Sequence, residues 1–408
     1  SRGVHLATSA DNNRRVLSGM RPTGSMHLGH LHGVLNNWIE LQFKYDCFFF
    51  VADWHALTTH YENPGDIQGN TREMVIDWLA TGVNPASATI FLQSDVIEHA
   101  ELHLLLSMIT PLGWLERVPS YKDQQERLKE LDLATYGFLG YPLLQSADIL
   151  IYRAGHVPVG EDQVAHVEMT REIARRFNHL YGREDNFEKK AKRALKQIGS
   201  KNRERYAIAR KRYQEKGDTE ALQKGRRLVL DSGRLTVADR DRLLGYLEGV
   251  GRTILAEPDA LLTHNPKVPG LDGQKMSKSY GNTISLREDP DVVAKKLKTM
   301  PTDPARVRRT DPGDPEKCPV WEFHKVYSDE DTRQWVEEGC RSAGIGCVEC
   351  KKPVIDAVLE ELAPIRERAR HYEEDPEAIR SVLNDGRERA RDVARETMDD
   401  VREAMGLE

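Results

Sequence analysis

Residues 18–30 read SGMRPTGSMHLGH and join a strand end, a glycine-rich turn and a helix start. The pattern predicts a short strand at Arg15–Ser18 and a helix from about His30 to Phe43. Small residues let a backbone approach a nucleotide, and the first turn of a helix offers unpaired N–H groups to phosphate. His27 and His30 can donate hydrogen bonds to phosphoryl oxygens as charge develops on them. Alone, the stretch also fits an ordinary strand–turn–helix with surface histidines.

Strand candidates alternate with helical segments through the first 180 residues. Cys47–Ala52 is continuously apolar, as in a strand buried on both faces of a parallel sheet. Ala88–Gln93 and His156–Val159 are further strand candidates, and a strand is expected again before Lys275. Helical patterns cover about residues 64–80, 98–108, 123–133 and 163–177. The alternation predicts a parallel α/β sheet that binds ligands at the carboxyl ends of its strands.

A second motif, KMSKS at residues 275–279, lies between Gly273 and Gly281. Two lysines three residues apart in a glycine-bounded loop can close over a triphosphate and stabilise departing pyrophosphate. The run by itself also fits a solvated basic loop.

Four of the five cysteines fall within 33 residues, with the spacing C-x21-C-x6-C-x2-C. They are Cys318, Cys340, Cys347 and Cys350. In a chain without an evident export signal this clustering favours a metal over disulfides. Four thiolates can hold zinc or an iron–sulfur cluster. Cys47, inside an apolar run, is expected in the core.

The composition, 39% hydrophobic and 30% charged over 408 residues, is that of a globular chain long enough for two or three domains. Its apolar runs are too short to span a bilayer, so no membrane association and a cytoplasmic location are expected. Charge is segregated: residues 189–252 hold 19 Lys and Arg against 8 Asp and Glu, a local net of +11. Residues 353–408 carry a net of −7. The basic segment suits a polyanion, or equally a solvated helical surface.

The HLGH and KMSKS stretches, about 245 residues apart, resemble the two signatures of class I aminoacyl-tRNA synthetases. Similarity to bacterial tryptophanyl-tRNA synthetases extends over about residues 14–182 and 255–400, and includes YPLLQSADIL at 141–150 and VGEDQ at 159–163. It implies a Rossmann-like α/β fold with a helical insertion and a helical C-terminal domain. The expected divisions are a catalytic domain in 1–182 and 253–290, a basic insertion in 183–252, and an anticodon-binding domain with the metal site in 291–408.

The resemblance also implies the activity. The chain would activate L-tryptophan with ATP and Mg²⁺ and pass the aminoacyl group to the 3′ end of tRNA(Trp), as a homodimer. The residues implied as catalytic are His27, His30, Lys275 and Lys278. The implied ATP contacts are Arg21, Pro22, Thr23, Gly29, His30, Gly160, Glu161, Asp162, Val268, Lys275, Met276, Ser277, Lys278 and Ser279.

Asp148 is the residue that the resemblance places against the indole nitrogen of tryptophan. Indole has one polar group, its N–H, and a buried carboxylate can accept a hydrogen bond from it. The residues alone leave open that Asp148 caps or solvates a helix. The implied pocket walls are His55, Gln145, Val157 and Val159.

Some bacterial tryptophanyl-tRNA synthetases carry a [4Fe–4S] cluster on a very similar cysteine pattern, so the resemblance favours that cluster over zinc. Three alternatives remain open. A tyrosyl-tRNA synthetase would share both signatures and the fold, and a non-catalytic paralogue could sense tryptophan or bind tRNA. An iron–sulfur redox protein would explain neither nucleotide motif.

Overall fold

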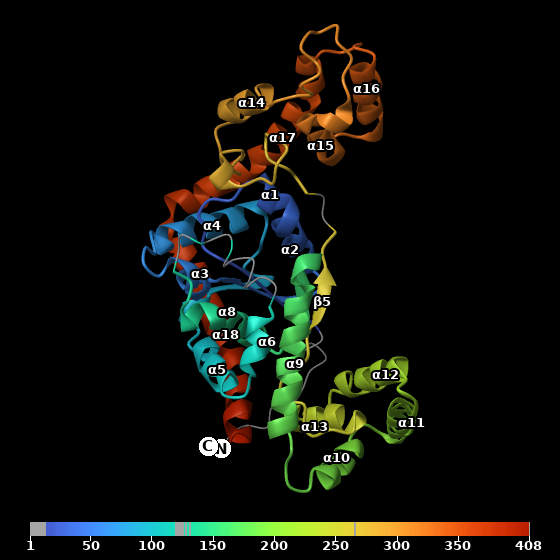
Figure 1. The fold of residues 1–408 in the computed structure, drawn as a ribbon. Coiled ribbons are helices and arrows are strands. Elements are labelled where there is room, and N and C mark those ends of the chain that lie inside the picture. Colours follow the sequence, from blue (N-terminus) through green and yellow to red (C-terminus); the bar gives the residue numbers. More distant parts are fainter. Residues whose placement is uncertain (1–13, 119–125, 127–128, 130–131, 265–266, 408) are drawn as a thin grey trace.

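A five-stranded parallel sheet forms the centre of the molecule (Figure 1). The structure is a computed structural model that describes residues 14–118, 126, 129, 132–264 and 267–407. The strand order is β3-β2-β1-β4-β5. The strands are β1 (Arg15–Met20), β2 (Asp46–Val51), β3 (Ala88–Leu92), β4 (His156–Val159) and β5 (Asp259–Leu262). This confirms the predicted α/β class, and the order reverses between β1 and β4, where such sheets bind ligands.

Strand β2 lies inside the sheet, between β3 and β1, and this position explains why its sequence is apolar without alternation. Cys47 and Phe49 point into one hydrophobic core, and Phe48 and Phe50 point into the core on the opposite face. Helices cover both faces of the sheet, so neither side of β2 meets water (Figure 1). Cys47 is fully buried, as predicted.

Several helices that pack around the sheet follow the predicted pattern. These are α4 (Ile67–Thr81), α5 (Glu98–Ser107) and α9 (Val164–Tyr181). The helix expected from His30 begins earlier and contains a π-helical turn, giving α1 (Leu28–His30), η1 (Leu31–Leu35) and α2 (Asn36–Leu41). The helix expected at 123–133 lies mostly outside the described residues.

Three helices were not predicted: α3 (Asp53–His60), α6 (Leu112–Glu116) and α8 (Tyr136–Leu150). Most side chains of α8 are buried, so it lacks the polar face that makes a helix visible in a sequence. Pro142 inside α8 further weakens the helical signal.

Two helical groups extend from opposite ends of the sheet region (Figure 1). At one end lie α10 (Phe187–Leu195), α11 (Ser200–Lys216), α12 (Thr219–Leu230) and α13 (Val237–Leu247). At the other lie α14 (Pro290–Lys298), α15 (Pro319–Tyr327), α16 (Glu330–Arg341) and the start of α17 (Cys347–Glu374). The last helix, α18 (Pro376–Ala404), returns past the sheet. Among the described residues, no helix is both long and apolar enough to cross a membrane.

Helix α18 packs directly on the backbone of the edge strand β3. A Cβ atom added at Gly386 would lie 1.6 Å from the carbonyl oxygen of Ile90. The helix can approach the strand this closely only because residue 386 has no side chain.

Replacing Gly386 by alanine tests this packing, because the close contact predicts a loss of stability where an open helix position would show a gain. In an open helix position Gly→Ala stabilises by about 1 kcal/mol. Here we expect a loss of about 1–3 kcal/mol, because the new methyl group must push the helix from the strand. The midpoint of thermal unfolding measures the change. Gly137→Ala in α8 is the matched control, because a Cβ there meets nothing within 4 Å. An unchanged or raised midpoint for Gly386→Ala would contradict the close packing.

Candidate active site

A cavity of about 440 Å³ opens beside the carboxyl ends of β1 and β4. Its lining brings together residues from distant parts of the chain, including Arg21, His55, Gln145, Asp148, Val157, Val159 and Gly160. All of these were singled out in the sequence. Tyr141 of α8 completes the wall, with the guanidinium carbon of Arg21 6.0 Å from its ring centroid.

Asp148 is a buried acceptor in the cavity wall. It lies inside α8 with 1% of its surface exposed, so it neither caps nor solvates a helix. Its Oδ1 accepts hydrogen bonds from Gln93 Nε2 at 2.9 Å and His99 Nδ1 at 2.6 Å. Its Oδ2 pairs with His55 Nε2 at 2.7 Å. A carboxylate offers about four lone-pair sites, so Oδ2 keeps one for a ligand.

The charge of Asp148 follows from these partners. Burial alone would raise the pKa of Asp148, but His55 and His99 oppose it and lower the pKa to about 2. The carboxylate is therefore ionised at neutral pH. A ligand that offers it no hydrogen-bond donor would leave a buried charge without a partner, which costs binding free energy.

His27 and His30 form a stacked pair at the helix start, with ring centroids 3.7 Å apart. His27 Nδ1 accepts from the Gly29 N–H at 3.1 Å, and His30 Nδ1 accepts from the His27 N–H at 3.1 Å. In a neutral ring whose Nδ1 accepts, the proton sits on Nε2. Burial, with help from neighbouring positive charge, lowers the pKa of His27 to about 3 and of His30 to about 4. Both imidazoles are thus neutral donors.

The KMSKS loop lies against this turn. Lys278, at the start of η4 (Lys278–Tyr280), donates to the Thr23 carbonyl at 2.7 Å. Met276 is buried, and its Cβ lies 3.4 Å from where a Cβ on Gly29 would be. Ser277 is held by its N–H to Asn282 Oδ1 at 2.9 Å.

Backbone pairing joins the two motifs as well. The Leu28 N–H donates to the Ile284 carbonyl at 3.0 Å, and the Leu286 N–H donates to the Met26 carbonyl at 3.0 Å. The segment that leaves the KMSKS loop is therefore fixed to the turn that carries the two histidines.

Asp77 and Arg287 brace this junction, and neither stood out in the sequence. Asp77 of α4 is fully buried, and its Oδ2 accepts the Met26 N–H at 2.7 Å. Its Oδ1 accepts from Arg287 Nε at 2.7 Å. Arg287 also pairs with Glu73 and, at 3.1 Å, with Glu373 at the end of α17. A carboxylate within the apolar run Val75–Ala80 was the one available signal for Asp77.

The sequence reasoning also missed Gln93 and His99, the partners of Asp148. Both are completely buried, Gln93 at the end of β3 in η2 (Gln93–Asp95) and His99 in α5. The polar Gln93 directly after an apolar strand could have drawn attention to it. Nothing local distinguishes His99.

Of the remaining expected nucleotide contacts, only Gly160 lines the cavity itself. Glu161 and Asp162 are exposed in η3 (Glu161–Gln163). The side chain of Val268 is buried in a hydrophobic core, so only its backbone could contact a nucleotide. Pro22 is buried, and Thr23, Lys275 and Ser279 are exposed.

Comparison with known proteins accounts for this arrangement. The family model for tRNA synthetases class I (W and Y) matches residues 9–198 and 239–363. A tryptophan–tRNA ligase from Ralstonia nicotianae is 66% identical over 393 residues, which cover 96% of this chain and 98% of the relative. The chain belongs to the class I tryptophan–tRNA ligases. A relative from Thermotoga maritima, named tryptophan–tRNA ligase, is 45% identical over 96% of this chain and 99% of its own.

A solved structure agrees with this family and with the fold of the synthetase. Tryptophanyl-tRNA synthetase from Campylobacter jejuni, complexed with ADP and tryptophan, superimposes with a TM-score of 0.71 at 28% identity. The match covers 96% of this chain and all of that chain.

The four cysteines of this synthetase lie around the ends of three helices. Cys318 precedes α15, Cys340 is near the end of α16, and Cys347 and Cys350 open α17. The four thiols lie near enough to act on one another: burial first, and then the other three sulfurs, raise the pKa of Cys350 to about 12. Within the described residues, however, no group of three or more His, Cys, Asp or Glu side chains is arranged to hold a metal ion. The predicted metal site is therefore not shown.

The depressed pKa values of His27 and His30 predict how stability changes with pH. An unfolded imidazole takes up a proton below about 6.5, while both folded ones stay neutral to about 4 or below. Their stabilising contribution is complete above pH 6.5 and falls as the pH drops from about 6.5 to about 4. His30→Asn removes one titrating ring, so the difference in unfolding temperature between wild type and variant should shrink from pH 7.5 to pH 5. An equal difference at both pH values would contradict the neutral state of His30.

Proposed function

We propose that the protein joins L-tryptophan to ATP in a Mg²⁺-dependent step and then transfers the tryptophanyl group to the 3′-terminal adenosine of tRNA(Trp). The observation that carries this function is one cavity lined both by the buried Asp148 and by Ser18–Arg21, where β1 enters the glycine-rich turn. The names of the relatives, tryptophan–tRNA ligase, support the same substrates.

Asp148 would recognise the indole. Its Oδ2 has one hydrogen-bond partner, His55, and can accept the indole N–H. The aromatic Tyr141 and the apolar Val157 and Val159 supply walls for a flat ring. A ligand without a donor would leave the carboxylate unpaired, which is the basis of strong discrimination.

The chemistry needs no side-chain base, because the tryptophan carboxylate is already a nucleophile at neutral pH. Its oxygen forms a bond to the α-phosphorus, and the bond from that phosphorus to the β-bridging oxygen breaks to release pyrophosphate. His27 and His30 would donate from Nε2, and Lys275 and Lys278 would add positive charge as the phosphates separate. Mg²⁺ would neutralise the triphosphate. The other expected contacts to ATP are Arg21, Pro22, Thr23, Gly29, Gly160, Glu161, Asp162, Val268, Met276, Ser277 and Ser279.

ATP–pyrophosphate exchange with each amino acid tests this function. We expect exchange with tryptophan and only background exchange with the others. Exchange with tyrosine instead would identify a tyrosyl-tRNA synthetase. No exchange with any amino acid would favour a non-catalytic tRNA- or tryptophan-binding paralogue.

The Asp148→Ala variant tests the recognition of indole. It should reduce kcat/KM for tryptophan by about 100-fold or more, because the indole N–H loses its buried partner. The KM for ATP should change far less. Ser146→Ala, two residues away in α8 and equally buried, controls for disturbance of the helix. Normal tryptophan activation by Asp148→Ala would disprove the assignment.

We also propose that the protein is a homodimer. Ile97, Leu104, Met108 and Leu112 are each more than half exposed, and all lie on or beside α5 and α6. Large apolar side chains gathered at the surface in this way mark a protein–protein contact.

The cysteines are proposed to hold a [4Fe–4S] cluster, with zinc as the alternative. The cysteine spacing supports this proposal, and all four cysteines lie at or near the ends of α15, α16 and α17. Bound metal would stabilise this part of the fold. The backbone here is held by Gly313, whose N–H donates to the Cys340 carbonyl at 2.9 Å.

Protein purified without oxygen should be brown, absorb near ~400 nm and contain about four irons per chain. The double change Cys347→Ser and Cys350→Ser should remove the colour and weaken tRNA charging while pyrophosphate exchange persists. Cys47→Ala, in the core of the sheet, is the control and should keep the colour. A colourless protein with one zinc per chain would exclude the cluster.

A further inference from the structure

The insertion between α9 and β5 folds around a hydrophobic core of its own. Helix α11 packs on α12, and α10 packs on α13. Tyr206 is buried at the centre and donates to the Leu243 carbonyl at 2.6 Å. The exposed side chains of these helices are therefore held in place by a packed hydrophobic core.

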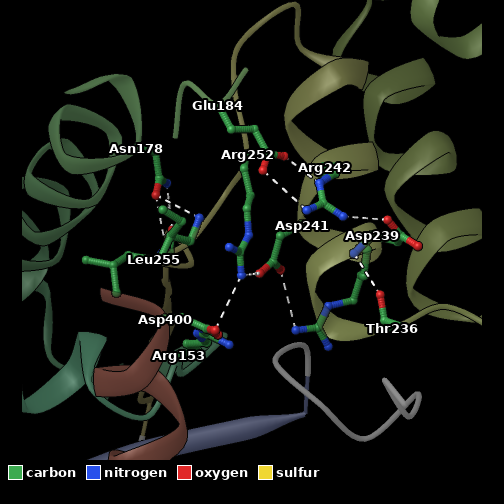
Figure 2. Close-up of polar contacts among 12 residues, drawn as sticks. Arg153, Asn178, Glu184, Thr236, Asp239, Asp241, Arg242, Arg252, Leu255 and Asp400 are labelled. Atoms are coloured by element: carbon green, nitrogen blue, oxygen red, sulfur yellow. Dashed lines mark hydrogen bonds and ion pairs between the residues drawn. The ribbon is translucent and has the colours of Figure 1, made fainter. Parts of the chain in front are cut away.

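The chain enters and leaves the insertion through a tight crossing. A Cβ atom on Gly251 would lie 2.4 Å from the Gly182 carbonyl oxygen, and one on Gly245 would lie 1.6 Å from the Gly251 carbonyl oxygen. The Arg252 N–H donates to the Gly182 carbonyl at 2.7 Å. Asn178 of α9 accepts the N–H groups of Ile254 and Leu255, both at 2.9 Å (Figure 2).

Ion pairs fix the orientation of the insertion at this crossing. Figure 2 shows Arg252 between Asp241 of α13 and Asp400 of α18, each at 3.5 Å. Asp400 also accepts from Arg153 at 2.6 Å. Arg242 of α13 pairs with Glu184. Asp241 and Arg153 are buried, so removing the partner of either one would leave a charge away from water. The insertion is therefore held in one position on the catalytic half.

A hollow of about 460 Å³ lies between α11 and α12, bordered by basic side chains. They are Arg205, Arg212, Lys224 and Arg227. Of the described acidic groups, none lies within 4 Å of Arg205, Arg212 or Arg227, and Lys224 reaches Glu220 only at 3.9 Å. Three acidic residues, Asp218, Glu220 and Asp231, also line the hollow, and Asp218 is the N-cap of α12. The four basic residues define the α11–α12 basic surface.

The charge and spacing of this surface suit a chain of phosphates. Arg205 and Arg212 are seven residues apart on one helix, about 10 Å along its axis. That distance is longer than a single small anion. Each guanidinium can bind two oxygens of one phosphate group. Ile208 is half exposed in the same hollow and gives an apolar contact for a sugar or base.

The location separates this surface from the chemistry. Helix α9 starts beside the cavity lining at Gln163 and ends at the insertion. Its 18 residues span about 27 Å. Phosphate groups bound at the α11–α12 basic surface would therefore touch neither tryptophan nor ATP.

We propose that the α11–α12 basic surface binds the phosphate backbone of tRNA at a site remote from its 3′ end. The inference rests on the proposed function, which makes tRNA the substrate. Contacts to phosphate are independent of base sequence, so the surface contributes affinity and does not select the tRNA.

Charge reversal in the full-length protein tests the proposal. The surface variant carries Arg205→Glu, Arg212→Glu and Arg227→Glu. The control variant carries Lys189→Glu, Lys192→Glu and Lys196→Glu, three exposed lysines on or beside α10 that change the net charge equally. The dissociation constant for tRNA is measured by fluorescence anisotropy over a range of salt concentrations.

The surface variant should lose about 10-fold or more in tRNA affinity, and its salt slope should fall by about two to three. The control should lose less than about threefold. Pyrophosphate exchange with tryptophan should be unchanged in both, because the cavity is remote. The milder Arg→Gln triple variant repeats the test if the Glu variant is unstable.

Equal losses in the surface and control variants would overturn the proposal, since net charge alone would then explain them. Unchanged affinity and slope in the surface variant would overturn it as well. A changed oligomeric state with unchanged tRNA affinity would assign the surface to an acidic face of a second chain. Absence of exchange in the wild type would refute the proposed function and leave the tRNA measurement interpretable on its own.

Discussion

The ion pair between Asp77 and Arg287 is the constraint on which the active site depends. Asp77 holds the Met26 N–H on one oxygen and Arg287 on the other, and so ties the HLGH turn to the segment after the KMSKS loop. These segments are about 260 residues apart in sequence. Backbone pairing of Leu28 with Ile284 completes the junction. Loss of either partner from a buried pair typically costs about 3–5 kcal/mol, because the other charge is left unpaired.

Through Arg287 the same junction reaches the C-terminal helices. Arg287 pairs with Glu373 at one end of α17, and Cys347 and Cys350 stand at the other end of that helix. One continuous helix thus extends from the cysteines to the base of the nucleotide site. The contact gives a physical route by which order in the C-terminal region can affect the position of the KMSKS loop.

The candidate site stabilises a charged group in one part and neutral groups in another. Asp148 keeps its charge despite complete burial because three donors surround it. His27 and His30 lose theirs because burial and nearby lysines disfavour a second positive charge. In the proposed function, the fixed anion accepts the indole N–H, and the neutral donors and nearby lysines meet the phosphates. The lysines would then stabilise charge that develops during the proposed reaction.

The sequence predicted the strands and turns that depend on neighbouring residues, and it missed the helix and the contacts that depend on packing between distant parts of the chain. The strand at Cys47–Ala52 and the turn at residues 18–30 were visible because their apolar and glycine patterns follow directly from local backbone needs. Helix α8 was not, because burial on nearly all sides removed its periodicity. His99 and Arg287 act only through partners far away in the chain, and no short pattern marks such a residue. The KMSKS loop was recognised from its residues, but the pairing that fixes it against the HLGH turn needed the structure.

A double-mutant cycle on Asp77 and Arg287 tests the central constraint most directly. The measurement is kcat/KM for ATP in tryptophan-dependent pyrophosphate exchange, for Asp77→Asn, Arg287→Gln and the double variant. If the pair acts as one brace, each single change should cost about 10-fold or more, and the double change should cost no more than the worse single. Losses that multiply, or single variants that fold and exchange normally, would contradict the account.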